Sequence, residues 1–221
     1  DLPYLQKISR LPMEGKKIIL STGMATVEEI AGAVSVLLEH VGTEALTILH
    51  CNTEYPTMDE DVNLSAIGDL QKHFPGIAIG FSDHSVGSVA AVGAAAMNIS
   101  MIEKHFTLDK NFEGPDHRAS ATPEELTALC RDVRRMEIML GGGGKRVTDS
   151  ERRNRMVARK SIVARRNIAR GELFSEENVT CKRPGSGISP MHWYEVLGRK
   201  AERDFCADEL IEDAGFEMQG E

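Results

Sequence analysis

The chain has 221 residues, of which 41% are hydrophobic, so it can bury a sizeable core and divide into two domains. Its 26 basic and 34 acidic residues give a formal net charge of -8, which argues against a general nucleic-acid surface. No apolar stretch approaches the ~20 residues that span a bilayer, and the first residues lack the pattern of a signal peptide, so we expect a cytoplasmic protein without nucleic-acid or membrane partners.

The first part of the chain alternates between short apolar runs and amphipathic patterns of helical period. The predicted strands are 17–20, 46–51, 77–81 and 101–106. The predicted helices are 26–39, 64–73, 89–97 and 123–140. Thr26, which precedes two glutamates, is the expected N-cap of the first helix. Because strand and helix alternate four times, the order predicts parallel βαβ units and an α/β fold.

A glycine run at 141–144 interrupts this alternation. A segment rich in arginine and lysine follows, and we predict that 145–160 is a linker whose charges form a solvated face rather than a phosphate site. Short strand patterns and turn residues beyond it predict a small β-rich domain over 161–221. The expected organisation is therefore a larger domain over 1–144, a linker and a small C-terminal domain.

Polar residues that can bind a metal stand at the ends of the last two predicted strands. Ser82, Asp83 and His84 end one strand, while Glu103 and His105 end the next. Side chains two positions apart on a strand share a face, so each histidine shares its face with a polar residue of the same strand. If these faces point into the mouth of a barrel, two imidazoles converge where a divalent transition metal such as manganese could bind.

The alternative interpretation is that each histidine only satisfies a buried carbonyl or caps a helix. One histidine alone favours that alternative, but two in matched positions, each beside a carboxylate, favour the metal site. Asp83 and Glu103 are then candidates to orient the imidazole rings or to accept protons.

Several motifs, in chain order, resemble the sialic acid synthases. They are KIILSTGM (17–24), HCNTEYPT (50–57), GFSDHS (80–85), IEKHFT (102–107), GPD (114–116) and KRPGSG (182–187). The resemblance covers essentially the entire chain and implies the C-terminal half of a (β/α)8 TIM barrel followed by a small β-rich antifreeze-like (SAF) domain. It also implies a reaction: phosphoenolpyruvate condenses with an N-acylated mannosamine-type amino sugar to give a nine-carbon ulosonic acid, and phosphate leaves by C–O cleavage.

The same resemblance implies roles for individual residues. His84 and His105 match the metal ligands, with Mn²⁺ or Mg²⁺ as the ion that activates the sugar aldehyde. The implied catalytic residues are Glu103, as first candidate for proton transfer, together with His84, His105 and Asp116. The implied substrate-binding residues are Ser21, Thr53, Tyr55, Ser82 and Arg183. Arg183 matches an arginine that enters the active site of the partner subunit, so a domain-swapped homodimer is implied.

Two features depart from the pattern of this family. Thr53 stands where many sialic acid synthases carry asparagine, and Asn52 is displaced by one position, which reverses the direction of its side chain on a strand. The variant HCNTEYP is more similar to the synthases of legionaminic acid. Only four strands precede the glycine run, whereas a closed barrel needs eight and about 250 residues. We therefore expect the C-terminal part of a longer enzyme, inactive alone and prone to associate through open strand edges.

Two other functions stay open at this stage. A different metal-dependent barrel aldolase or lyase could share the paired histidines, and analysis of the product separates it from a synthase. The chain could also be a non-catalytic carbohydrate-binding module on a decayed barrel. Turnover that survives removal of the residues after Gly144 would indicate a separate binding task for the C-terminal domain.

Overall fold

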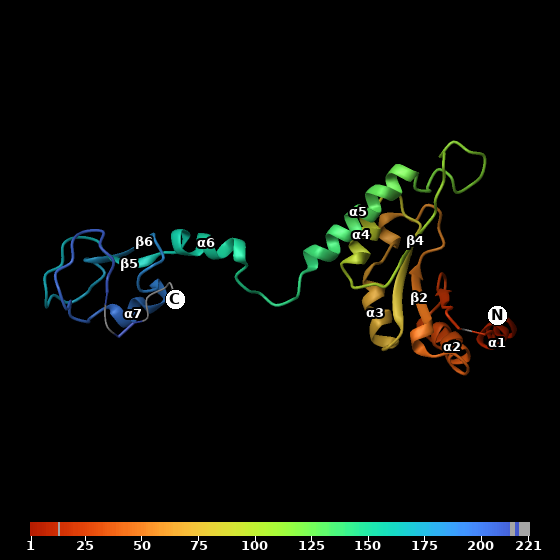
Figure 1. The fold of residues 1–221 in the computed structure, drawn as a ribbon, viewed down its shortest axis with the longest axis horizontal. Coiled ribbons are helices and arrows are strands. Elements are labelled where there is room, and N and C mark those ends of the chain that lie inside the picture. The colour runs from red at the N-terminus through yellow and green to blue at the C-terminus, as the bar shows by residue number, and fades with distance from the viewer. Residues whose placement is uncertain (13, 213–214, 217–221) are drawn as a thin grey trace. The chain divides into compact units, whose positions relative to one another are not determined.

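The computed structural model describes residues 1–12, 14–212 and 215–216. The chain separates into two compact units, Asp1–Gly143, here called the barrel unit, and Gly144–Glu221, here called the C-terminal unit (Figure 1). Among the residues with described positions, no helix is both long and apolar enough to cross a membrane.

The barrel unit contains one sheet of four parallel strands in the order β1-β2-β3-β4. The strands are β1 (Ile18–Ser21), β2 (Leu46–Cys51), β3 (Ala78–Asp83) and β4 (Ile102–Lys104). Each is followed by a helix, in order α2 (Val27–Leu38), α3 (Ser65–His73), α4 (Val89–Ala95) and α5 (Pro123–Leu140). Four consecutive parallel strand and helix units form half of a (β/α)8 barrel, so the predicted α/β fold is confirmed.

Helices α2, α3 and α4 pack on one face of this sheet and bury the apolar core of the barrel unit. Ile48 of β2 and Phe81 of β3 point to this helical side and are 0% and 3% exposed. Residues one position away point to the opposite side, where Ile19 of β1 remains 49% exposed. The alternation of strand side chains therefore directs one set to the core and leaves the other on the inner face of the half-barrel.

Local capping fixes where the helices begin. Thr26 accepts a hydrogen bond from Glu29 N, and the Glu29 carboxylate accepts one from Thr26 N, so the predicted N-cap of α2 is confirmed as a full capping box. Thr122 and Glu125 make the same arrangement at the start of α5. Helix α1 (Leu2–Ser9) was not among the predicted elements, nor were the short 3₁₀ turns η1 (Thr43–Ala45) and η2 (Asp59–Asp61).

The C-terminal unit is built on two antiparallel strands, β5 (Ser161–Ala164) and β6 (Val179–Lys182). Two further short elements follow, η3 (Pro190–His192) and α7 (Trp193–Val196). Side chains from across the unit form a second core, with members Ile162, Ala164, Ile168, Phe174, Val179, Ile188, Val196, Ala201, Phe205 and Ile211. Helix α6 (Asp149–Ala158), with a capping box at Thr148, occupies most of the segment predicted as a linker.

Candidate active site

The register of β3 and β4 places Ser82 directly opposite Glu103, near the carboxyl ends of the strands. Ser82 Oγ donates a hydrogen bond to Glu103 Oε1 at 2.6 Å and lies 3.1 Å from His84 Nε2. The predicted sharing of faces thus brings a hydroxyl, a carboxylate and an imidazole together. Since the Ser82 hydroxyl has a single proton and donates it to Glu103, the hydrogen bond to His84 forms when Nε2 carries a proton, and an unprotonated Nε2 would present its lone pair beside the Ser82 oxygen.

The backbone of the loop after β2 orients the His84 ring. Nδ1 of His84 donates to the carbonyl oxygen of Asn52 at 2.5 Å, and because a carbonyl only accepts, Nδ1 carries a proton. Asn52 is itself held by its side chain, which accepts from Glu54 N at 2.7 Å and donates to Asp61 O at 3.3 Å. Nε2 of His84 is therefore the ring nitrogen available to a metal or a proton.

A second imidazole and a phenol complete this cluster. The ring centroids of His84 and His105 lie 5.3 Å apart, and the Tyr55 ring lies 4.2 Å from the first and 5.2 Å from the second. Burial is the main factor that raises the pKa of Tyr55 above its usual value, and the negative charges of Asp116 and Glu103 add to it. The phenol of Tyr55 therefore stays protonated to a higher pH than usual and can donate a hydrogen bond.

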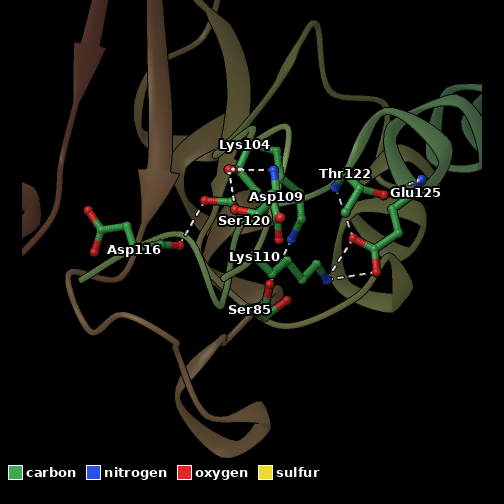
Figure 2. Close-up of polar contacts among 9 residues, drawn as sticks. Ser85, Lys104, Asp109, Lys110, Asp116, Ser120, Thr122 and Glu125 are labelled. Atoms are coloured by element: carbon green, nitrogen blue, oxygen red, sulfur yellow. Dashed lines mark hydrogen bonds and ion pairs between the residues drawn. The ribbon is translucent and has the colours of Figure 1, made fainter. Parts of the chain in front are cut away.

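Asp116 approaches the cluster from the loop that follows β4. Its carboxylate lies 4.0 Å from Nδ1 of His105, while its backbone carbonyl accepts from Ser120 Oγ at 2.8 Å (Figure 2). Figure 2 also shows a neighbouring surface ion pair between Lys110 and Glu125, 2.7 Å apart. Asp116 is thus within reach of the second histidine through only a small side-chain movement.

The remaining predicted substrate residues lie on other segments. Ser21 ends β1 and is exposed on the inner face of the sheet. Thr53 packs over the loop after that strand: a methyl group added at Gly23 would lie only 2.4 Å from Thr53 Cγ2. Arg183 belongs to the C-terminal unit, where its Nε donates to Ala158 O at 3.0 Å. Its role in the site of a partner subunit stays a prediction.

The paired imidazoles fit a divalent ion that takes only two ligands from this part of the protein. Across the residues that the structure describes, no group of three or more His, Cys, Asp or Glu side chains is arranged to hold an ion. His84 and His105 can still supply two nitrogen ligands, and the bond from Nδ1 to Asn52 O is the kind of outer contact that fixes a metal-binding histidine. Water and substrate oxygens would fill the other positions.

One residue does not act as the sequence suggested, and two roles were missed. The Asp83 carboxylate neither orients a ring nor faces the cluster, because the pleat turns it to the helical side, where it binds Lys104 at 2.8 Å. His50 faces that side too and stacks on Phe81. Asn52 and Lys104 are the overlooked residues; that Lys104 follows Glu103 on a strand was the signal that it points away from the cluster.

Comparison with known proteins gives a consistent picture. The family model described as the NeuB family matches residues 1–145, and the SAF domain model matches 159–217. The chain is 46% identical to the N,N'-diacetyllegionaminic acid synthase of Campylobacter jejuni, over 96% of this chain and 63% of that protein. It is 39% identical to a pseudaminic acid synthase of the same species, over 92% of this chain and 58% of that protein.

A solved structure from Chromobacterium violaceum, a putative spore coat polysaccharide biosynthesis protein E, is also similar. It matches with a TM-score of 0.68 and 28% identity, over 99% of this chain and 64% of that one. The chain thus spans less than two thirds of the length of the curated relatives described above.

Proposed function

The chain belongs to the NeuB family, and from this premise we propose that it serves a phosphoenolpyruvate-dependent synthase of nine-carbon ulosonic acids. The observation that carries the proposal is the cluster of His84, His105, Glu103 and Ser82 at the carboxyl ends of neighbouring parallel strands. Barrel enzymes place their catalytic groups at this end of the strands. The names of the similar proteins support an N-acylated amino sugar as the second substrate.

The two imidazoles would hold the divalent ion, Mn²⁺ or Mg²⁺. When bound, such an ion polarises an aldehyde oxygen as a Lewis acid, which favours attack by C3 of phosphoenolpyruvate on the aldehyde carbon. The protein contributes by keeping His84 in one orientation through the carbonyl of Asn52, so that Nε2 faces the substrates. Holding two polar substrates together then lowers the entropic part of the barrier.

We assign proton transfer to Glu103. Its carboxylate accepts from Ser82, which fixes its orientation without consuming its second oxygen. Water adds at C2 of the former phosphoenolpyruvate, and Glu103 takes the proton that this water releases and passes it to the alkoxide formed from the aldehyde. The tetrahedral carbon then expels phosphate by cleavage of its C–O bond, and its hydroxyl proton goes to the departing phosphate as the ketone forms. Tyr55, whose phenol is protonated at neutral pH, donates a hydrogen bond to a substrate oxygen.

For the acceptor we propose 2,4-diacetamido-2,4,6-trideoxymannose, which gives a legionaminic acid. The HCNTEYP motif and the similarity to a diacetyllegionaminic acid synthase both support this choice. Thr53 offers a methyl group where an asparagine amide would offer two hydrogen-bonding groups, and it packs directly on Gly23. A less polar pocket wall suits a sugar that lacks the 6-hydroxyl.

Phosphate release tests the proposal. The experiment uses the product of the longest reading frame that contains these 221 residues, here called the full gene product, with phosphoenolpyruvate and Mn²⁺. Turnover with the diacetamido sugar but not with N-acetylmannosamine is expected, and mass spectrometry should identify a nine-carbon acid. Turnover only with N-acetylmannosamine would replace the acceptor, and release with neither sugar would contradict the proposed reaction.

We further propose that two copies share their active sites, with Arg183 of one entering the site of the other. Subunit mixing tests this arrangement. Glu103→Gln and Arg183→Ala variants of the full gene product are each expected to be nearly inactive alone. If Arg183 acts across the dimer, mixed dimers contain one site with both native residues and regain activity. If it acts within its own chain, no mixed dimer has an intact site and activity stays lost.

A further inference from the structure

A buried ion pair lies behind the candidate active site, on the helical side of the sheet. Lys104 Nζ lies 2.8 Å from Asp83 Oδ2, and the two side chains are 5% and 0% exposed. Lys104 also donates to the carbonyl oxygen of Ser85 at 2.7 Å. The other carboxylate oxygen of Asp83 accepts from Ser85 N at 2.9 Å and from Ser85 Oγ at 2.6 Å. The pair is therefore buried with hydrogen bonds on both carboxylate oxygens.

The position of this pair along the strands links it to the site. Asp83 stands between Ser82 and His84, and Lys104 stands between Glu103 and His105. Because strand side chains alternate, the pair points to one face while its four neighbours point to the other. Asp83 and Lys104 also form the last paired positions of the β3 and β4 ladder, and the histidines follow immediately after it.

The contacts of Lys104 continue where the backbone ladder stops. Asp83 and Ser85 are the residues on either side of His84 in the sequence, and Lys104 binds both of them from the neighbouring strand. The backbone N–H and the hydroxyl of Ser85 both donate to the Asp83 carboxylate. A change in the backbone at Asp83 would therefore rotate His84 and Ser82 together. A change at Lys104 would rotate His105 and Glu103 in the same way.

We propose that Asp83 and Lys104 are positioning residues for the reaction assigned above, and that they hold the ends of β3 and β4 so that His84 and His105 converge on one point. This inference rests on the proposed function but concerns groups that touch no substrate. A misplacement of about 1 Å in a catalytic group can cost ~100-fold in rate. The pair therefore contributes through the placement of the imidazoles, beyond any contribution to folding.

Two variants of the full gene product separate positioning from folding. Lys104→Met leaves the Asp83 carboxylate buried without its partner, so both thermal stability and kcat should fall. The double variant Asp83→Asn with Lys104→Met removes both charges at similar volume, so most of the lost stability should return. Lys110→Met is the matched control, because Lys110 and Glu125 lie at a similar distance of 2.7 Å but their side chains are 34% and 51% exposed.

We expect the double variant to unfold near the wild-type temperature. Its kcat should nevertheless stay ~10-fold to ~100-fold below that of the wild type, with a smaller change in KM. The Lys110→Met control should retain wild-type kcat. Recovery of both stability and kcat in the double variant would overturn the inference, since the pair would then serve folding alone. Wild-type kcat in Lys104→Met would overturn it as well.

A spectroscopic measurement keeps the inference testable if the proposed reaction fails. Ring nitrogen and proton signals of the histidines can be recorded by NMR without metal or substrate. In the double variant, the signals of His84 and His105 should shift, while those of His73 on α3 and His192 on η3 should not. Such shifts support positioning even for a protein that turns over neither sugar, and unchanged His84 and His105 signals overturn it.

Discussion

The two units of the chain close their cores in different ways. The C-terminal unit surrounds its core on all sides: Ile162, Phe205 and Ile211 are at most 2% exposed. In the barrel unit, β1 and β4 pair with a neighbour on one side only, and Ile19 and Phe106 are 49% and 51% exposed. The barrel unit is also the one that presents an imidazole and carboxylate cluster.

This difference indicates that the closed core of the C-terminal unit serves stability, while the polar cluster of the barrel unit serves the chemistry. A small unit with a closed core can hold its structure through burial alone, whereas the carboxyl ends of parallel strands can carry polar side chains that lie outside the apolar core. We therefore expect substitutions in the cluster to change turnover with little effect on folding, and core substitutions in the C-terminal unit to do the opposite. Trp193 is the only tryptophan of the chain and packs on the core of the C-terminal unit, so its fluorescence reports on that unit.

The largest effect is expected for Glu103→Gln in the full gene product. Glutamine can still accept the bond from Ser82 but cannot take a proton, so kcat should fall by ~10²-fold to ~10⁴-fold. Steady-state phosphate release measures this loss, and thermal unfolding followed by far-UV circular dichroism should be unchanged. The exposed Glu124, in the first turn of α5, provides the control: Glu124→Gln should leave kcat as it is. Equal losses in both variants would contradict the assignment.

The converse change is Phe205→Ala in the C-terminal unit. Phe205 is 2% exposed and packs against Phe174 at a centroid distance of 5.9 Å, so its truncation should lower the free energy of unfolding by about 3–5 kcal/mol. Urea unfolding monitored by Trp193 fluorescence gives the value. Leu173→Ala, at a side chain that is 52% exposed, should cost less than about 0.5 kcal/mol. A similar cost at both positions would mean that the core is less closed than its burial indicates.

A smaller and local effect is expected at the capping boxes. Thr26→Ala should destabilise α2 by about 1 kcal/mol, because Glu29 N loses its acceptor. Hydrogen exchange followed by mass spectrometry should show faster exchange in α2 peptides. Thr148→Ala removes the corresponding cap of α6, so faster exchange should then appear in α6 peptides and not in α2. Faster exchange in both units from either change would argue against their independence.

The smallest effect concerns acid stability in the C-terminal unit. Arg166 is the main cause that lowers the pKa of Glu172 to about 2, with further bonds from Asn178 and Ala169 N. Because the folded value lies below the unfolded one, the carboxylate stabilises the unit above about pH 4.5 and this contribution disappears as pH falls toward 2. The stability difference between wild type and Glu172→Gln, measured through Trp193, should shrink over that window. A constant difference would contradict the lowered pKa.

The sequence predicted the barrel unit well because buried parallel strands are continuous apolar runs. The limits of β2 and α5 match the predicted 46–51 and 123–140, and the resemblance to the sialic acid synthases is confirmed by the family match. Helix α6 was missed because its residues are mostly charged or polar and no apolar stripe marks it. The spacing of Thr148 and Glu151, a capping box, was the signal that could have revealed it.

The candidate site was predictable only in part. The period of a strand is enough to place Ser82 with His84 and Glu103 with His105. It says nothing of backbone acceptors, so the carbonyl of Asn52 that fixes the His84 ring has no signature in the sequence. The same period could have excluded Asp83, because a residue between two inward-facing neighbours must point the other way.

The contact between Gly23 and Thr53 has an evolutionary consequence. Any side chain at Gly23 would place its first carbon 2.4 Å from the methyl group of Thr53, well inside van der Waals contact. A replacement of Thr53 is compatible with Gly23, whereas a side chain gained at Gly23 requires the Thr53 methyl group to move or to be removed. The side chain at position 53 therefore limits which residues position 23 can accept.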